Sequence, residues 1–254
     1  MELKDQVAIV TGAGRGVGRA LALEFARQGM HVVCAARRGN EIQETVKLIG
    51  AEALAIPTDV TDRAQVQSMV NKTIEAFGRI DVLFNNAGSF SALGPVWEVD
   101  ADIWWQDVTV NLRGSMLCAR AVLPHMIRQN GGVVINMAGG NQIPGGTGYS
   151  CSKWALPRLT ELLAKELEHE GHDVFVFTMG PGFVHTEMTQ LQIDSPEGRK
   201  WLPSSKDAIR KGANRPPEDC AKAAVQLLRL ACRELNGQAF GVETDWYEVE
   251  ARLG

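Results

Sequence analysis

Tyr149 and Lys153 are the residues of this chain whose types and spacing best suit the movement of a proton. They stand in the segment YSCSK at the start of a predicted helix, where a spacing of four places both side chains on one face. A tyrosine hydroxyl in water has a pKa of about 10, and a nearby ammonium group favours its ionised form. The pair therefore predicts a proton donor and acceptor with a charged neighbour.

The second chemical feature is a glycine-rich segment, TGAGRGVG, which runs from Thr11 to Gly18 after the first predicted strand. Glycines let a backbone approach a pyrophosphate closely, and the N-terminus of the following helix points amide hydrogens at it. The G-x-G-x-x-G spacing fails, because Val17 occupies the sixth position counted from Gly12. The longer T-G-x-x-x-G-x-G spacing still predicts a dinucleotide site here.

The end of the second predicted strand, CAARR, indicates which dinucleotide binds. NAD-binding folds place an acidic residue there to hold the ribose 2′-hydroxyl, and Ala36 stands at that position. Arg37 follows it and Arg15 lies in the glycine segment; two guanidinium groups suit a 2′-phosphate. The sequence therefore favours NADP(H) over NAD(H). Arg38 is either a second contact or a solvated charge.

The elements that position these residues alternate along the whole chain. We predict strands at 7–10, 32–36, 53–56, 82–85, 133–136, 174–178 and 239–242, and helices at 19–28, 64–77, 112–129 and 154–168. This alternation predicts one α/β domain over residues 1–254, with a parallel sheet covered by helices on both faces. Residues 182–217 are rich in proline, serine, glycine and charge, which indicates a substrate lid or a surface excursion.

Composition excludes several other classes of function. The chain has 254 residues, 45% of them hydrophobic, and a net charge of −4 without a basic stripe, so we expect no nucleic acid or membrane partner. Its first residues do not resemble a signal peptide. Five scattered cysteines without a C-x-x-C pair predict free thiols in a reducing, cytoplasmic compartment, and five scattered histidines predict no metal site.

Six motifs, in order, resemble those of the short-chain dehydrogenase/reductase family. They are the glycine segment, Asp59-Val60 after the third strand, NNAG at 85–88, Asn111 in TVNLRG, YSCSK at 149–153 and PGFVHT at 181–186. The resemblance covers nearly the whole chain. It implies a single Rossmann-like domain, a doubly wound parallel sheet of about seven strands, which assembles as a homodimer or homotetramer.

The resemblance also implies roles for single residues. Tyr149 would transfer the proton, and Lys153 would hold the nicotinamide ribose and, with an oxidised nicotinamide, lower the pKa of Tyr149. Asn111 would hold a water that links Lys153 to solvent. The implied cofactor-binding residues are Thr11, Gly12, Gly14, Arg15, Gly16, Val17, Gly18, Arg37, Asp59, Val60, Asn86, Ala87, Gly88, Tyr149, Lys153, Pro181, Gly182, Val184 and Thr186.

One residue of the family pattern is missing. The family places a serine after the fifth strand as a second donor to the substrate oxygen; here INMAG puts Ala138 and Gly139 there, with Gly139 at the catalytic position. A slip of one residue finds no serine before Ser150. Losing such a donor costs about 10²–10³ in rate. Asn141, Thr147 or a water beside Gly139 would replace this donor, or the substrate would need only the tyrosine. If the site merely lacks a donor, Gly139→Ser should raise turnover.

The expected function is NADP(H)-dependent transfer of hydride between the nicotinamide and a carbonyl or secondary alcohol. A catalytically lapsed dinucleotide-binding regulatory protein and a dehydratase or epimerase of the same fold remain alternatives. Gly139 and Asn141 are the candidate substrate-binding residues. Large apolar side chains near the expected site favour a small hydrophobic substrate: Phe90, Trp97, Trp154, Phe183, Met188 and Trp201.

Overall fold

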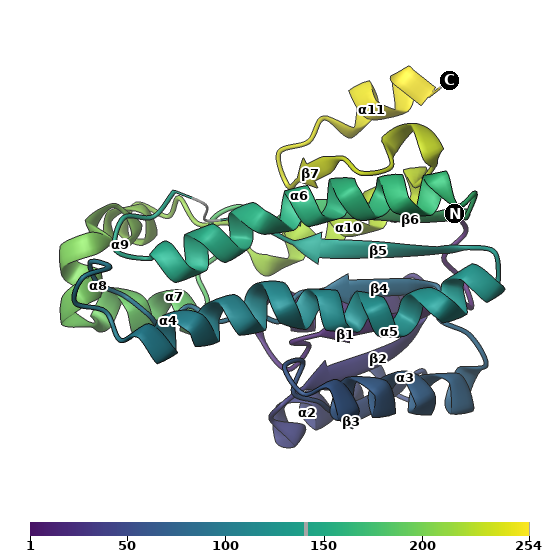
Figure 1. Ribbon diagram of the computed structural model, residues 1–254, viewed down its shortest axis with the longest axis horizontal. Coiled ribbons are helices and arrows are strands. Elements are labelled where there is room, and N and C mark those ends of the chain that lie inside the picture. Colours follow the sequence, from purple (N-terminus) through teal and green to yellow (C-terminus); the bar gives the residue numbers. More distant parts are fainter. Residues whose placement is uncertain (140–141, 254) are drawn as a thin grey trace.

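A computed structural model describes residues 1–139 and 142–253, which form one parallel sheet of seven strands with helices around it (Figure 1). The strands lie in the order β3-β2-β1-β4-β5-β6-β7. Their bounds are β1 (Val7–Thr11), β2 (His31–Ala36), β3 (Ala53–Pro57), β4 (Val82–Asn85), β5 (Gly132–Met137), β6 (Val174–Gly180) and β7 (Ala239–Gly241). All seven predicted strands are confirmed to within two residues at each end.

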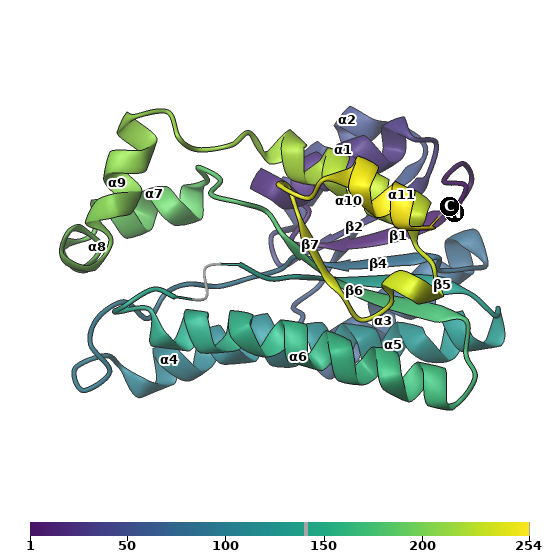
Figure 2. The same ribbon diagram turned by 90° about the horizontal axis from the view of Figure 1, so that it is seen from above.

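Helices cover both faces of the sheet, so the predicted doubly wound fold is confirmed (Figure 2). One face carries α1 (Gly16–Arg27), α2 (Gly39–Ile49), α10 (Pro217–Leu230) and α11 (Trp246–Leu253). The other carries α3 (Arg63–Phe77), α5 (Gly114–Arg128) and α6 (Thr147–His169). Helix α4 (Ala101–Val108) passes through a π-helical turn, η1 (Thr109–Arg113), into α5, and a short turn, η2 (Arg233–Leu235), precedes β7.

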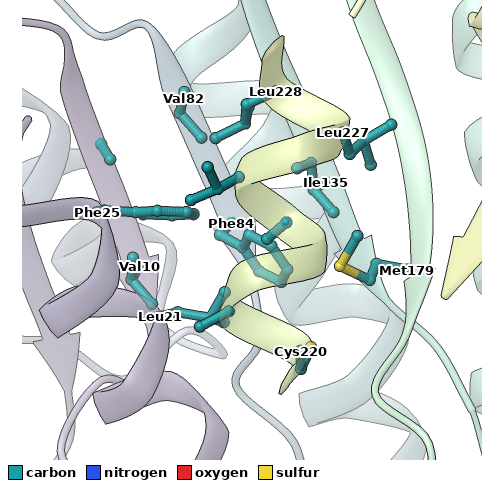
Figure 3. Packing of buried hydrophobic residues seen from close by; sticks show 14 of the residues in the cluster. Val10, Leu21, Phe25, Val82, Phe84, Ile135, Met179, Cys220, Leu227 and Leu228 are labelled. Carbon is teal, nitrogen blue, oxygen red and sulfur yellow. The ribbon is translucent and has the colours of Figure 1, made fainter. Parts of the chain in front are cut away.

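The strands are apolar because both of their faces are buried. Val82 and Phe84 of β4 belong to the core under α1 and α10, whereas Leu83 between them belongs to the core under α3 and α5. Phe84 meets Phe25 of α1 with ring centroids 6.2 Å apart (Figure 3). Burial on both faces explains why these segments read as continuous apolar runs rather than alternating ones.

Residues 182–217 contain three short helices where the sequence indicated an irregular stretch. These are α7 (Glu187–Asp194), α8 (Pro196–Trp201) and α9 (Pro203–Arg210), and they lie beyond the carboxyl ends of the strands (Figure 2). Prolines begin α8 and α9, where a missing N–H is tolerated. The hydroxyl oxygen of Ser195 caps α8 by accepting a hydrogen bond from the Gly198 N–H at 2.9 Å. Movement of this segment as a lid stays a prediction.

Two other features bear on the classes of function considered above. Within residues 1–139 and 142–253, no helix is both long and apolar enough to cross a membrane. In the same ranges, no three side chains of histidine, cysteine, aspartate or glutamate gather as metal ligands would. All five cysteines are free thiols, and Cys34, Cys118 and Cys220 are buried.

Candidate active site

A cavity of about 570 Å³ lies where the strand order reverses between β1 and β4, at the carboxyl ends of the strands. The predicted cofactor-binding residues that line it are Gly12, Gly14, Arg15, Gly16, Val17, Gly18, Arg37, Asp59, Val60, Asn86, Ala87, Gly88, Tyr149, Lys153, Pro181, Gly182, Val184 and Thr186. Parallel strands bring these distant segments to one edge of the sheet. The structure therefore gathers almost the whole predicted set around one space.

The glycine segment needs its glycines for two different reasons. Gly12 and Gly16 have φ angles of 68° and 53°, which residues with a Cβ rarely adopt. A Cβ at Gly18 would lie 2.1 Å from the carbonyl oxygen of Gly12, so a side chain cannot fit there. Helix α1 begins at Gly16 and has no acidic residue in its first turn. Because Gly16, Val17 and Gly18 line the cavity, the positive end of this helix faces it, as an anion-binding site requires.

Thr11, the one predicted cofactor residue outside the cavity lining, ties the glycine segment to NNAG. Its hydroxyl oxygen accepts hydrogen bonds from the N–H groups of Asn86 and Ala87, both at 3.0 Å. The amide of Asn86 donates in return to the Thr11 carbonyl at 2.9 Å. Below them, the buried Asn85 amide donates to the Asn136 side-chain oxygen of β5 at 3.0 Å. The two loops are thus held as one unit.

The end of β2 carries the arginines that the sequence assigned to a 2′-phosphate. Arg37 is exposed at the cavity and makes no ion pair with any residue that the structure describes. Arg38 instead pairs with Glu41 of α2, with 2.6 Å between Nη1 and Oε1. Sequence reasoning missed Glu41, which lines the cavity beside Gly14. An acidic residue just after the strand, at the start of α2, was the signal that could have found it.

Arg15 of the glycine segment is ion-paired with Glu187, the first residue of α7. Glu187 also lines the cavity, and the sequence gave no role to it. The neighbouring Thr186 lies against the glycine segment, because a Cβ at Gly16 would be 3.3 Å from its methyl carbon. The segment after β6 thus reaches across the cavity to the start of α1.

Helix α6 brings Tyr149 and Lys153 together at the cavity wall. The Lys153 ammonium lies 5.9 Å from the centre of the Tyr149 ring and donates to the Met137 carbonyl oxygen at 2.8 Å. Phe90 stacks on Tyr149 with ring centroids 4.5 Å apart and planes 12° from parallel. The lysine is anchored on β5, and the tyrosine ring is fixed between α6 and the segment after NNAG.

Burial decides the protonation of both side chains. Removal from water, followed by the negative charge of Asp107, raises the pKa of Tyr149 to about 12. Burial lowers the pKa of Lys153 to about 8. The sequence led us to expect that the ammonium group and an oxidised nicotinamide lower the pKa of Tyr149, whereas burial acts in the opposite direction. A protonated tyrosine at neutral pH can give a proton more readily than it can take one.

Asn111 lies in η1 and holds the segment after NNAG against the lysine. Its side-chain nitrogen donates to the Ser89 carbonyl and the Ser152 hydroxyl, both at 2.9 Å, and its oxygen accepts from the Ser89 N–H at 2.8 Å. A Cβ at Gly88 would lie 3.2 Å from that oxygen and 3.6 Å from the Lys153 nitrogen. These bonds make Asn111 a positioning residue; its proton path through water stays a prediction.

The backbone geometry favours Ala138 over Gly139 as the position of the missing hydroxyl. Gly139 has a φ of 108°, and a Cβ there would lie 3.2 Å from Pro181, so a serine would be strained. Ala138 continues the ladder of β5, donating its N–H to the Met179 carbonyl at 2.9 Å. It stands two residues after Asn136, whose side chain reaches α6, so its Cβ faces the same layer. That layer carries Tyr149.

The residues predicted to substitute for that hydroxyl lie at different places relative to the cavity. The Thr147 hydroxyl oxygen accepts a hydrogen bond from the Trp104 ring nitrogen at 2.9 Å, and Thr147 does not line the cavity. Asn141 lies outside the residues that the structure describes. Gly139 lines the cavity as predicted for a substrate-binding residue.

Only some of the predicted apolar residues reach the cavity. Phe90, Phe183 and Met188 line it, and so do Ile143 and Leu202, which the sequence did not indicate. Trp97 and Trp154 are exposed, at 78% and 62%, and do not line it. Trp201 packs on the segment before α6, because a Cβ at Gly145 would lie 2.6 Å from its ring.

Comparisons with known proteins agree with this geometry. Residues 6–196 match the family model described as short chain dehydrogenase. An uncharacterized oxidoreductase of Listeria monocytogenes is 36% identical over 200 residues, covering 76% of this chain and 80% of the relative.

Two solved structures share the fold over nearly their whole length. A 3-ketoacyl-(acyl-carrier-protein) reductase from Brucella melitensis, complexed with NADH, has a TM-score of 0.81 and 28% identity over 94% of this chain and 97% of its own. A short chain dehydrogenase/reductase from Burkholderia phymatum, in complex with NAD, has a TM-score of 0.83 and 29% identity over 100% of this chain and 93% of its own. This chain therefore belongs to the short-chain dehydrogenase family of oxidoreductases.

Proposed function

We propose that this protein transfers hydride between NADP(H) and the carbonyl or secondary alcohol group of a small molecule. The observation that carries the proposal is the single cavity shared by the glycine segment, Arg37, Tyr149 and Lys153. A dinucleotide laid along that cavity would have its phosphates at the start of α1 and its other end near α6. Binding and proton transfer would therefore take place in one site.

The chain's own residues would handle the proton. Bound cofactor supplies the hydride that converts a carbonyl carbon to a carbinol carbon. The Tyr149 hydroxyl donates its proton to the oxygen of that group, and the Lys153 ammonium stabilises the negative charge left behind. Because the pKa of Tyr149 is raised, its hydroxyl is protonated at neutral pH, which is the form that donates to a carbonyl oxygen.

The choice of NADP(H) rests on charge at the end of β2. Ala36 leaves no carboxylate at the position that binds a free 2′-hydroxyl, and Arg37 is exposed at the cavity. Glu41 acts against a 2′-phosphate, but its ion pair with Arg38 reduces that repulsion. The two structural neighbours hold NADH and NAD, so the arginine is the feature that needs a direct test.

Substituting Arg37 tests the cofactor directly. Arg37→Asp should lower kcat/KM with NADPH by about 10–100-fold and leave the value with NADH equal or higher, because a carboxylate repels the 2′-phosphate. Arg63→Asp is the matched control, since Arg63 is exposed and lies outside the cavity lining. An unchanged NADPH-to-NADH ratio in the Arg37 variant would mean that the cofactor argument is wrong.

The cavity wall supports a small hydrophobic substrate. Phe90, Ile143 and Leu202 line the space near Tyr149 together with the proposed lid. The Brucella neighbour is by its name a ketoacyl reductase, which supports a ketone as the group reduced. We propose a ketone or secondary alcohol with an apolar body.

The protein is further proposed to be a cytoplasmic homodimer or homotetramer. Helices α4, α5 and α6 expose large apolar side chains that a partner copy would cover, namely Trp105, Met116, Trp154 and Leu162. Sedimentation or light scattering on the purified chain checks the assembly, and a monomer would contradict it.

Cofactor consumption across a panel of aromatic and aliphatic ketones tests the activity. The parent should oxidise NADPH with at least one ketone, and Tyr149→Phe should lose most of this turnover while binding NADPH equally well. Tight NADPH binding without any turnover would favour the regulatory alternative, which the missing hydroxyl at Ala138 supports. Product formation without net cofactor use would instead indicate a dehydratase or epimerase.

A further inference from the structure

Asp107, near the end of α4, is a fully buried carboxylate that the preceding mechanism does not use. One of its oxygens accepts a hydrogen bond from the Ser89 hydroxyl at 2.6 Å. The other accepts from the N–H groups of Ser91 and Ala92, at 2.8 and 2.9 Å. Burying a carboxylate is costly unless it is fully hydrogen-bonded, and these donors lower that cost.

Asp107 and Asn111 are four residues apart and hold the same segment. Asn111 binds the backbone N–H and carbonyl of Ser89, and Asp107 accepts hydrogen bonds from the N–H groups of Ser91 and Ala92. Phe90 lies between these anchored points, which fixes its ring 4.5 Å from that of Tyr149. The geometry of the tyrosine therefore depends on the helix that carries Asp107.

The charge of Asp107 is a separate matter from its hydrogen bonds. Two charged groups lie on the elements packed around Tyr149. The Lys153 ammonium of α6 is 5.9 Å from the centre of its ring, and the Asp107 carboxylate of α4 binds the segment whose Phe90 stacks on that ring. Strands β5 and β6 carry no charged side chain, and Arg113 of η1 donates to a backbone carbonyl after β3. Across the cavity, Glu187 is paired with an arginine of the glycine segment. The neighbouring negative charge that is not paired with a cation is therefore that of Asp107, within the described residues.

We propose that Asp107 positions Phe90 against Tyr149 and, through its negative charge, disfavours ionisation of the Tyr149 hydroxyl, so that the tyrosinate needed to accept a proton from an alcohol forms only at higher pH. This inference rests on the proposed function of the site. The raised pKa of Tyr149, to which Asp107 contributes after burial, agrees with it. A negative neighbour disfavours a tyrosinate, whatever substrate is bound.

Asp107→Asn removes the charge and keeps the shape. The amide oxygen can still accept from Ser91 and Ala92, and the amide nitrogen can donate to the Ser89 hydroxyl, which can turn towards Ser91 at 3.2 Å. Asp102→Asn is the matched control, because Asp102 lies on the same helix but is exposed. Both substitutions change the net charge equally.

The chain has two tyrosines, which allows a direct readout. Tyr247 is 87% exposed and does not line the cavity. A Tyr247→Phe background therefore leaves Tyr149 as the single source of tyrosinate absorbance. In that background, Asp107→Asn should move the ultraviolet titration midpoint of Tyr149 to lower pH, and Asp102→Asn should not. Circular dichroism confirms that each variant is folded over the titration. An unmoved midpoint in Asp107→Asn overturns the proposal.

Kinetics give a second readout that separates this inference from the proposed function. With NADP⁺ and an alcohol that the parent oxidises, the pH profile of kcat/KM should shift to lower pH in Asp107→Asn, with a several-fold gain at neutral pH. A parent without any turnover refutes the proposed function, and the spectroscopic titration still tests Asp107. A parent that turns over, with identical profiles for both proteins, refutes the role of Asp107 alone.

Ser89→Ala keeps the test decisive if Asp107→Asn does not fold. That variant removes one donor to the carboxylate and leaves its charge, so the Tyr149 midpoint should stay at or above the parent value. A midpoint below the parent value would show that packing of the segment, rather than the charge of Asp107, sets the ionisation of Tyr149, and would overturn the proposal.

Discussion

Ala138 and Gly139 follow β5, and of these two residues Gly139 has a positive φ, at which a side chain would be strained. The left-handed φ of Gly139 was not visible in the sequence, because a glycine there fits an extended as well as a turned backbone. From motif spacing alone the serine position fell on Gly139. The hydrogen bond from the Ala138 N–H to the Met179 carbonyl continues β5 and favours Ala138, one residue earlier, as the serine position.

Ala138→Ser should therefore raise kcat by up to about tenfold, because it adds a donor beside the reacting oxygen, whereas Gly139→Ser should lower it. Steady-state rates with one ketone and NADPH measure both variants. Equal or lower turnover in Ala138→Ser would indicate that another group already donates to the substrate, and higher turnover in Gly139→Ser would contradict the assignment of the position.

Burial of Lys153 beside Tyr149 lowers the free energy of unfolding of the protein. Its pKa is about 8 in the folded protein against about 10.4 in an unfolded chain, so the unfolded state binds more protons in that window. The free energy of unfolding therefore rises as pH increases from about 8 to about 10.4 and is lowest below it. The lysine is buried for its place beside Tyr149 and not for the strength of the fold.

Lys153→Met should abolish turnover and yet raise the free energy of unfolding by about 1–3 kcal/mol at neutral pH, with a smaller gain near pH 10. Denaturant unfolding at the two pH values measures this, with Lys47→Met on the exposed face of α2 as the control. A gain that is the same at both pH values would show that ionisation of Lys153 is not its cause.

At the scale of elements, helix α8 contacts the segment that leads into α6, the helix that carries Tyr149 and Lys153. Trp201 lies against the backbone of Gly145, which has no side chain to keep it away. The following residue, Leu202, lines the cavity. This packing joins the proposed lid to the start of α6, so the substrate end of the cavity depends on it while the phosphate end does not.

Trp201→Ala should raise the KM for a ketone by about tenfold, the factor that 1.4 kcal/mol represents, and leave NADPH affinity within a factor of about two. Trp97→Ala is the matched control, because that indole is 78% exposed and outside the cavity lining. Equal losses of NADPH and ketone binding would mean that α8 supports the whole cavity rather than the substrate end.

Elements were predictable from the sequence to very different degrees. The strands are apolar on both faces and short, so β1 and β4 were found within one residue. Helices α2, α4, α10 and α11 have no counterpart among the helix ranges named from the sequence. The three helices of 182–217 were missed because prolines and charges interrupt their apolar spacing. Asp107 could not be assigned, since its partners are backbone groups that only the tertiary structure brings to it.

At the scale of the whole molecule, the order of strands in the sheet brings together residues that are far apart in the sequence. Strands β1 and β4 are neighbours although about seventy residues separate them, and this places the glycine segment beside NNAG and α6. The motif order alone predicted that these residues would meet. The acidic residues Glu41, Asp107 and Glu187 come from three different helices, and their convergence on the cavity and on the segment that borders it followed from no motif.

The central claim, hydride transfer at a site in which Tyr149 supplies the proton, is tested most directly by following the hydrogen itself. NADPH carrying deuterium at both C4 positions of the nicotinamide is incubated with a ketone that the parent reduces, and the alcohol is examined by mass spectrometry. We expect one deuterium on the carbinol carbon with the parent protein and almost none with Tyr149→Phe, which still binds NADPH. Alcohol without deuterium, or equal labelled product from both proteins, would contradict the account.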